Sequence, residues 1–209
     1  MSASTAAAAG HVHHVEAPSV LFRRQRLGVL LLILADVAFT LSLIFTYFYL
    51  RGLNTEDGWV PADGGTTAAI SGAWWIFAVM VLSLLAYEWG GRGIAGGNSS
   101  RLMVGTLIAL VLVLVDMGLQ IFQLANMPMH SKDGVYQGSY MSSFVALSAY
   151  HVVHLLLALF VGLALWNRAR KGLYSSENHY QATLVGYWWR WVTAAALLTA
   201  LTLSFTSAG

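Results

Sequence analysis

Three ionisable side chains lie inside long apolar runs, where a charged group is costly to bury. Asp36 lies in the run that begins at Leu27, and His151 and His154 lie in the run that begins at Ser142. If both runs are helical, each group is roughly 14–18 Å from the start of its run, at about 1.5 Å per residue. The two histidines are three residues apart, so they share one helix face. We therefore expect Asp36, His151 and His154 to form one polar cluster midway through the apolar layer.

A second set of polar residues lies in the run Leu102–Ala125. Asp116 and Gln120 are four residues apart, and Gln123 follows about one turn later, which predicts a polar stripe along one helix. Glu88 stands at the end of another run, where we expect its carboxylate to reach lipid headgroups. Arg190 lies inside the last run.

The cluster of Asp36, His151 and His154 is open to several interpretations. Two histidines and a carboxylate can bind iron or zinc. Bis-histidine haem needs ligands from both sides of the ring, which two histidines of one helix do not supply. Proton handling is a further alternative, but hydrogen bonds between helices, worth about 0.6–2 kcal/mol each, explain the groups most simply. We assign no catalytic, cofactor-binding or metal-binding residue, and expect the tail histidines to be solvated: His11, His13 and His14.

The composition identifies the class of protein that must position these groups. The chain has 209 residues, of which 57% are hydrophobic and 10% charged, with a mean hydropathy of +0.64. Soluble domains carry about 25% charged residues, so a soluble globule is excluded. The near balance of 11 basic and 9 acidic residues indicates no nucleic-acid partner. The absence of cysteine excludes disulfide scaffolds and thiolate metal centres. The sequence therefore predicts a polytopic membrane protein.

Five runs are long enough to cross a bilayer as helices, which needs about 20 apolar residues. They are Leu27–Leu50, Ala68–Trp89, Leu102–Ala125, Ser142–Trp166 and Thr183–Phe205, separated by short polar loops. We predict an all-α bundle of five transmembrane helices forming a single domain over residues 21–209. Residues 1–20 are predicted to be a mobile tail.

The basic residues predict the orientation of the bundle, because cytoplasmic loops carry the excess of Lys and Arg. One side carries eight basic residues: Arg23, Arg24, Arg26, Arg92, Arg101, Arg168, Arg170 and Lys171. The other side carries two, Arg51 and Lys132. The N-terminus is therefore expected in the cytoplasm and the C-terminus on the opposite side. Arg51 and the tail arginines Arg23, Arg24 and Arg26 are candidates for contact with lipid phosphates.

At these same residues the chain resembles subunit III of the haem–copper oxidases, the cytochrome c and quinol oxidase family. The run Leu27–Arg51 resembles the family helix with a mid-membrane acid. The segment Asp133–Tyr140 resembles the family's D-G-x-Y-G-S entry, with one inserted residue, and Tyr150–His154 resembles its aromatic-H-x-x-H signature. Gln120 resembles the Gln of its Q-x-x-E motif. The resemblance covers all five runs and is to a short form lacking two of seven spans.

The chain departs from the family pattern at Gln123 and in the last span, where both the family's His and its Asp are missing. Gln123 stands where the family has Glu. The last span reads W-H-F-V-D in the family, whereas Trp189–Thr193 reads W-R-W-V-T, so that a cation, Arg190, replaces the histidine.

The resemblance implies a non-redox role in a respiratory terminal oxidase of a bacterial or archaeal cytoplasmic membrane. Haem and copper would reside in subunit I, which this chain would contact directly, with subunit II and other subunits completing the complex. The chain itself would carry no cofactor, hold phospholipid and support proton uptake during reduction of O2 to water. Two alternatives remain, a subunit III-like protein that accompanies nitric oxide reductase and a small proton-coupled transporter.

Overall fold

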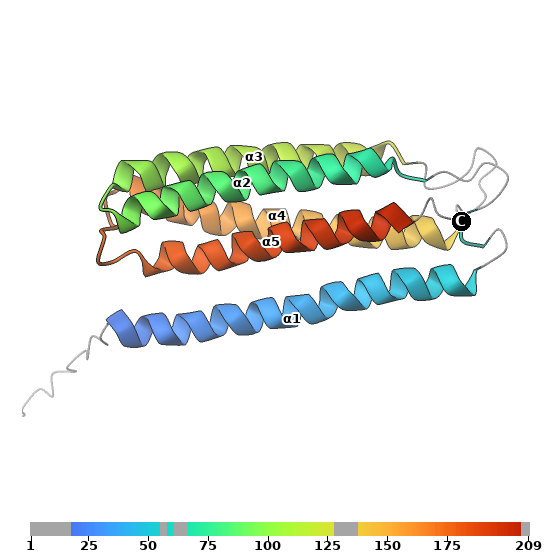
Figure 1. Cartoon of the computed structure of the whole chain (residues 1–209), viewed down its shortest axis with the longest axis horizontal. Coiled ribbons are helices and arrows are strands. Elements are labelled where there is room, and N and C mark those ends of the chain that lie inside the picture. Colours follow the sequence, from blue (N-terminus) through green and yellow to red (C-terminus); the bar gives the residue numbers. More distant parts are fainter. Residues whose placement is uncertain (1–17, 55–57, 61–66, 128–137, 206–209) are drawn as a thin grey trace, which may run out of the picture.

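The apolar runs form five α-helices in the computed structural model, which describes residues 18–54, 58–60, 67–127 and 138–205. The helices are α1 (Pro18–Leu53), α2 (Ile70–Ala95), α3 (Ser99–Ala125), α4 (Ser139–Arg170) and α5 (Tyr180–Ser204) (Figure 1). No strand occurs among the described residues, which confirms the all-α prediction. Residues 1–17 of the predicted tail, with its three histidines, lie outside the described part, as do residues 133–137 of the Asp133–Tyr140 motif.

Helices α1 to α4 are long and apolar enough to cross a membrane. Helix α5 is not among them, because Arg190 and its aromatic neighbours lower the hydropathy of its N-terminal half. Helix α1 begins at Pro18, nine residues before the expected span, and so includes part of the segment predicted as a tail. Proline is favoured at the first position of a helix, since its missing N–H would be unpaired there in any case.

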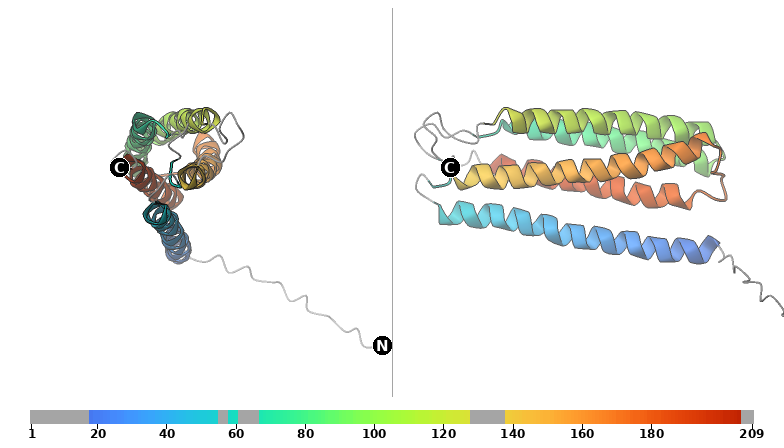
Figure 2. Two further views of the ribbon diagram at one scale, coloured as in Figure 1. Left: turned by 90° about the vertical axis from the view of Figure 1, so that its right-hand side faces the viewer. Right: turned by 180° about the vertical axis from the view of Figure 1, so that it is seen from behind.

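Helices α2, α3, α4 and α5 form a ring in which each helix contacts its two neighbours, and α1 lies outside this ring against α4 and α5 (Figure 2). The eight basic residues of the predicted cytoplasmic side share one end of the bundle, which we call the basic end. The other end, where α2 begins and α3 ends, is the opposite end. Of the most apolar stretch of α1 only 6% is buried, against 39% for α3 and α4. Helix α1 is thus the least enclosed of the four.

Three glycines allow helices α2 and α3 to approach closely, namely Gly90 and Gly93 on α2 and Gly105 on α3. A Cβ on Gly105 would lie 2.7 Å from the Cα of Gly90 and from the carbonyl oxygen of Ala86. A Cβ on Gly93 would lie 2.6 Å from the side chain of Arg101. The expected span Ala68–Trp89 therefore ends too early: α2 continues to Ala95, and its glycines Gly90 and Gly93 pack against α3.

The interior of the ring is closed by polar bonds as well as apolar packing. Trp189 donates its indole N–H to the hydroxyl of Ser83 over 3.0 Å, and Ser83 donates to the carbonyl of Ala109 over 2.9 Å. The ring of Trp189 stacks on Tyr87 with centroids 4.7 Å apart. These contacts join α2, α3 and α5.

The glycine contact gives a test of the α2–α3 interface. The variant Gly105→Ala is expected to lower the free energy of unfolding by about 1–3 kcal/mol, because the methyl group overpacks the contact. Gly118→Ala is the matched control on α3, since a Cβ there meets nothing within 4 Å. Denaturation in mixed micelles measures both, and equal stabilities of the two variants would contradict the interface.

Candidate functional site

Asp36 joins α1 to two helices of the ring. Its carboxylate accepts hydrogen bonds from the hydroxyl of Tyr150 on α4 and from the indole N–H of Trp191 on α5. Nε2 of His154 lies 2.7 Å from Oδ2 of Asp36. An ionised carboxylate only accepts hydrogen bonds, so Nε2 of His154 donates to Asp36 whenever Asp36 is ionised. One side chain of α1 therefore has three donors around it, from two different helices.

Aromatic rings enclose the Asp36–His154 pair. The ring of Tyr150 packs on His154 with centroids 4.4 Å apart and on Phe39 with centroids 4.7 Å apart. Trp188 approaches His154 edge-on at 5.7 Å. The side chain of Asp36 is 12% exposed and that of His154 is 3% exposed. Little water reaches the pair, and its hydrogen bonds are correspondingly strong.

The structure divides the predicted cluster between two carboxylates. His151 lies one turn from His154 on α4, but its Nε2 is 3.3 Å from Oδ2 of Asp116 on α3. Asp116 is 0% exposed and His151 3% exposed. The reason is the helix order: α1 and α3 pack on different sides of α4 and do not contact each other. His154 therefore lies with Asp36, and His151 lies with the predicted second stripe.

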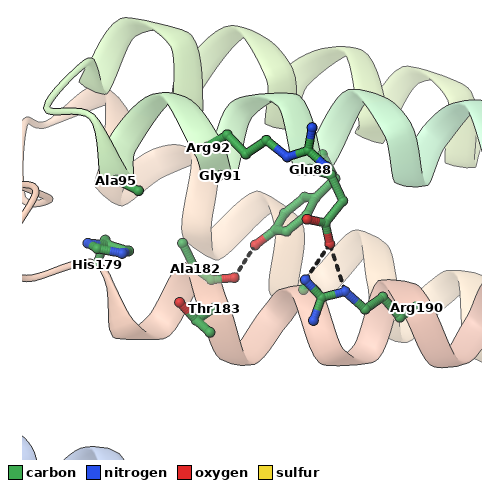
Figure 3. Close-up of a pocket in the computed structure, with 10 residues that line it drawn as sticks. Glu88, Gly91, Arg92, Ala95, His179, Ala182, Thr183 and Arg190 are labelled. Atoms are coloured by element: carbon green, nitrogen blue, oxygen red, sulfur yellow. Dashed lines mark hydrogen bonds and ion pairs between the residues drawn. The ribbon is translucent and has the colours of Figure 1, made fainter.

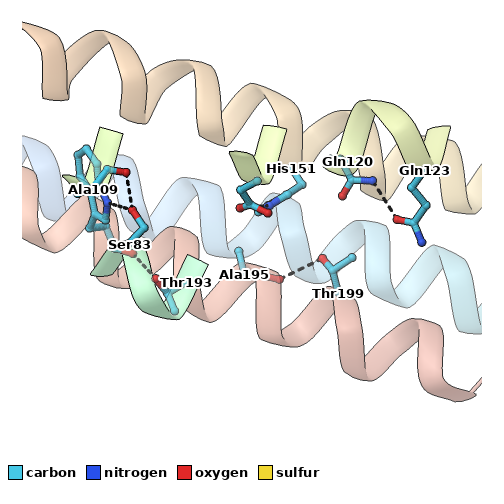
Figure 4. A network of polar contacts seen from close by, with 10 residues as sticks. Ser83, Ala109, Gln120, Gln123, His151, Thr193, Ala195 and Thr199 are labelled. Carbon is cyan, nitrogen blue, oxygen red and sulfur yellow. Dashed lines mark hydrogen bonds and ion pairs between the residues drawn. The ribbon is translucent and has the colours of Figure 1, made fainter. Parts of the chain in front are cut away.

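The second stripe runs along α3 from Asp116 toward the opposite end, and Figure 4 shows its members Gln120 and Gln123. Gln120 donates its amide N–H to Oε1 of Gln123 over 3.3 Å, and Gln123 donates to the backbone carbonyl of Ala69, the residue before α2, over 3.5 Å. Both contacts are long for N–H···O hydrogen bonds. The stripe is thus continuous in position but loosely bonded.

Arg190 forms an ion pair that the sequence interpretation missed. Its Nε and Nη2 lie 2.8 and 2.7 Å from Oε1 of Glu88 on α2 (Figure 3). We expected Glu88 to reach lipid headgroups; it pairs across the α2–α5 contact instead. Glu88 lies seven residues before the end of α2 and Arg190 ten residues after the start of α5, both counted from the basic end. Their similar depths, roughly 10 and 15 Å, were the signal available in the sequence.

The same ion pair borders a pocket of about 220 Å³ between α2 and α5, which Arg92 and His179 also line. The remaining candidates for lipid contact lie at the two ends of α1. Arg23, Arg24 and Arg26 are exposed at the basic end, where the guanidinium of Arg26 lies 6.0 Å from the ring of Tyr187. Arg51 lies in the last turn of α1 at the opposite end.

Metal binding would need several ligands directed at one point. Within residues 18–54, 58–60, 67–127 and 138–205, no group of three or more His, Cys, Asp or Glu side chains is placed to hold a metal ion. The arrangement can do two things chemically. It can hold helices together through charged hydrogen bonds, and it can keep a proton on either of two carboxylate–imidazole pairs.

The contacts of Asp36 give a test of its role. The variant Asp36→Leu is expected to lower the free energy of unfolding by about 2–4 kcal/mol, because three donors lose their acceptor. Asp36→Asn keeps one acceptor oxygen and is expected to lose less. Trp191→Phe removes one donor only and is expected to lose least. Unfolding in mixed micelles measures all three, and wild-type stability of Asp36→Leu would show that the bonds do not hold α1.

The chain is 23% identical over 174 residues to cytochrome c oxidase subunit 3 of the liverwort Marchantia polymorpha. The match covers 80% of this chain, which spans 63% of the length of that protein. No protein-family model matches the chain. This distant similarity supports a relationship to the cytochrome c oxidase subunit 3 family.

Proposed function

We propose that this chain is a non-redox subunit III of a respiratory haem–copper terminal oxidase. One observation carries the proposal: Asp36 is fully engaged in bonds between helices, through Tyr150, His154 and Trp191. A carboxylate held in this way stabilises a membrane bundle. The distant relative is a subunit 3 of cytochrome c oxidase, and this similarity suggests the kind of complex to which such a bundle belongs.

In this proposal the chemistry takes place on a neighbouring polypeptide. Subunit I holds haem and copper and reduces O2 to water, and this chain packs directly against it in the membrane, with subunit II and other subunits alongside. The chain stabilises subunit I, holds phospholipid and supports proton uptake during turnover. Apolar side chains exposed along α1 suit either lipid tails or a neighbouring subunit, for example Leu27, Leu34 and Phe45.

The proposal includes five spans in a bacterial or archaeal cytoplasmic membrane. Helix α5 crosses with the others because its ring neighbours α2 and α4 flank it and Glu88 neutralises Arg190. The basic end faces the cytoplasm, by the bias of Lys and Arg. The C-terminus then lies on the other side.

Purification through a tag on this chain tests the function. In gentle detergent we expect a haem-bearing subunit I to co-purify and to give a haem spectrum. Asp36→Ala is expected to lower the yield of complex or shorten its active lifetime, while the initial rate of O2 reduction per haem is retained. Leu34→Ala, at a side chain of α1 that is 63% exposed, is the matched control. An Asp36→Ala complex with intact haem and no initial turnover would contradict the supporting role.

The same preparation separates the alternatives. A complex that reduces nitric oxide and not O2 would indicate the subunit III-like protein of nitric oxide reductase. Solute-dependent proton flux by this chain alone in liposomes would indicate a transporter. Either result would replace the oxidase proposal.

The topology has its own test, which the absence of cysteine makes simple. Single cysteines are placed at Asn126, Ser175 and Phe205, beyond or between helices. An impermeant maleimide added to spheroplasts is expected to label Asn126→Cys and Phe205→Cys, and to label Ser175→Cys only after permeabilisation. Labelling of Ser175→Cys and Phe205→Cys from the same side would show that α5 does not cross.

A further inference from the structure

A layer of polar side chains lies inside the ring of α2–α5, apart from the Asp36 site. Asp116 and Gln120 belong to α3, and Ser148 and His151 belong to α4. All four are at most 3% exposed. Helix α1 does not contact α2 or α3, so this layer is separate from the carboxylate that holds α1 in place.

Two oxygen atoms of this layer are buried without a hydrogen-bonding partner among the described residues. They are Oδ1 of Asp116 and the hydroxyl oxygen of Ser148. An unpaired buried polar atom costs about 1–3 kcal/mol, and more when it is charged. Buried water is the usual means of removing that cost. The side chains of the layer therefore leave these two oxygens without hydrogen bonds, and buried water is expected to supply them.

A small cavity lies beside two other members of the layer, Gln120 and His151, and neither Asp116 nor Ser148 lines it. Its volume is about 10 Å³, and its polar lining consists of Gln120, Gln123, His151 and Thr199. A single water needs about 10–15 Å³ and two to four polar partners. The hydroxyl of Thr199 donates to the carbonyl of Ala195, which leaves its oxygen able to accept (Figure 4). The cavity matches one water in both size and lining.

Gln123 stands between this cavity and the outside. It lines the cavity and also a groove of about 560 Å³ between α2 and α3 at the opposite end. Its two hydrogen bonds, of 3.3 and 3.5 Å, are weak enough to exchange. The missing side chain of Gly72 makes the position possible, since a Cβ there would lie 2.8 Å from Nε2 of Gln123.

We propose that this layer is a hydrated proton-exchange site, in which water bound by Gln120, His151 and Thr199 connects the Asp116–His151 pair to the groove. Rotation of the Gln123 amide opens the connection. A proton that reaches the cavity water passes to the imidazole or the carboxylate of the pair and leaves by the same route, with no bond to carbon made or broken. The route faces the end opposite to the basic end.

The titrating groups of the layer are few. Helix α2 contributes Ala73 and Ile76 to the cavity, and α5 contributes alanines, Thr199 and Leu203, none of which titrates in the physiological range. Asp116 on α3 and His151 on α4 are the ionisable side chains of the layer. His154, one turn further along α4, pairs with Asp36 on the other side of that helix.

Infrared difference spectroscopy of the full chain, or of its native complex, tests the proposal by transfer from H2O to D2O. The infrared bands of the Asp116–His151 pair are identified by their loss in Asp116→Asn. The bands of the Asp36–His154 pair are identified by their loss in Asp36→Asn. The pair is expected to exchange its proton for deuterium several times faster than the Ser83–Trp189 bond of the same ring interior. Histidine labelled with 15N in the ring assigns the His151 bands in the wild-type protein, so the test does not require Asp116→Asn to fold.

Gln123 provides the decisive variant. Gln123→Leu is expected to slow exchange of the Asp116–His151 pair severalfold and to leave that of Asp36–His154 unchanged. Phe122→Leu is the matched control, because Phe122 lines the groove but not the cavity. Exchange as slow as that of the Ser83–Trp189 bond, or a rate unchanged by Gln123→Leu, would overturn the proposal. Neither outcome bears on whether the chain belongs to an oxidase.

Discussion

One carboxylate, that of Asp36, bonds α1 to two helices of the ring. In a membrane, apolar contact does not distinguish a neighbouring helix from lipid tails, so packing alone gives α1 little reason to stay against the ring. Its most apolar stretch is only 6% buried. Asp36 favours contact with the ring over contact with lipid, because its three donors belong to α4 and α5. Aromatic pairs at both ends, Phe22 with Tyr180 and Phe48 with Phe205, then fix the tilt of α1.

Helix α4 is the element that the two polar sites share. His151 and His154 differ by one turn, yet one faces α3 inside the ring and the other faces α1 outside it. A rotation of α4 large enough to break one carboxylate–imidazole pair would also disturb the other. The two sites therefore define a single rotational setting of α4, and through it the relative positions of α1 and α3, which do not touch.

Hydropathy and depth arithmetic predicted much of this arrangement from the sequence, and the reason for their limits is physical. Depth depends only on the distance along a helix, so the shared level of Asp36 and the histidines was predictable. The partner of each histidine depends on the order of helices around the ring, which no single run encodes. Gly90 and Gly93 suggested the end of the helix because glycine is a poor helix former. Their packing against α3, which keeps them helical, is a tertiary contact that the run itself does not reveal. The pairing of Glu88 with Arg190 was within reach of the same arithmetic.

The departures of the last helix from the subunit III pattern are compensated locally. Where the pattern has Phe, Trp191 adds an indole donor to Asp36 that a phenyl ring does not have. Where it has His, Arg190 takes Glu88 as a counter-ion. Where it has Asp, Thr193 donates to the carbonyl of Trp189 over 2.8 Å, inside its own helix. Each change is thus matched by a partner already present, and none leaves an unpaired charge in the apolar layer. The bundle keeps its central carboxylate while exchanging much of the polar chemistry around it.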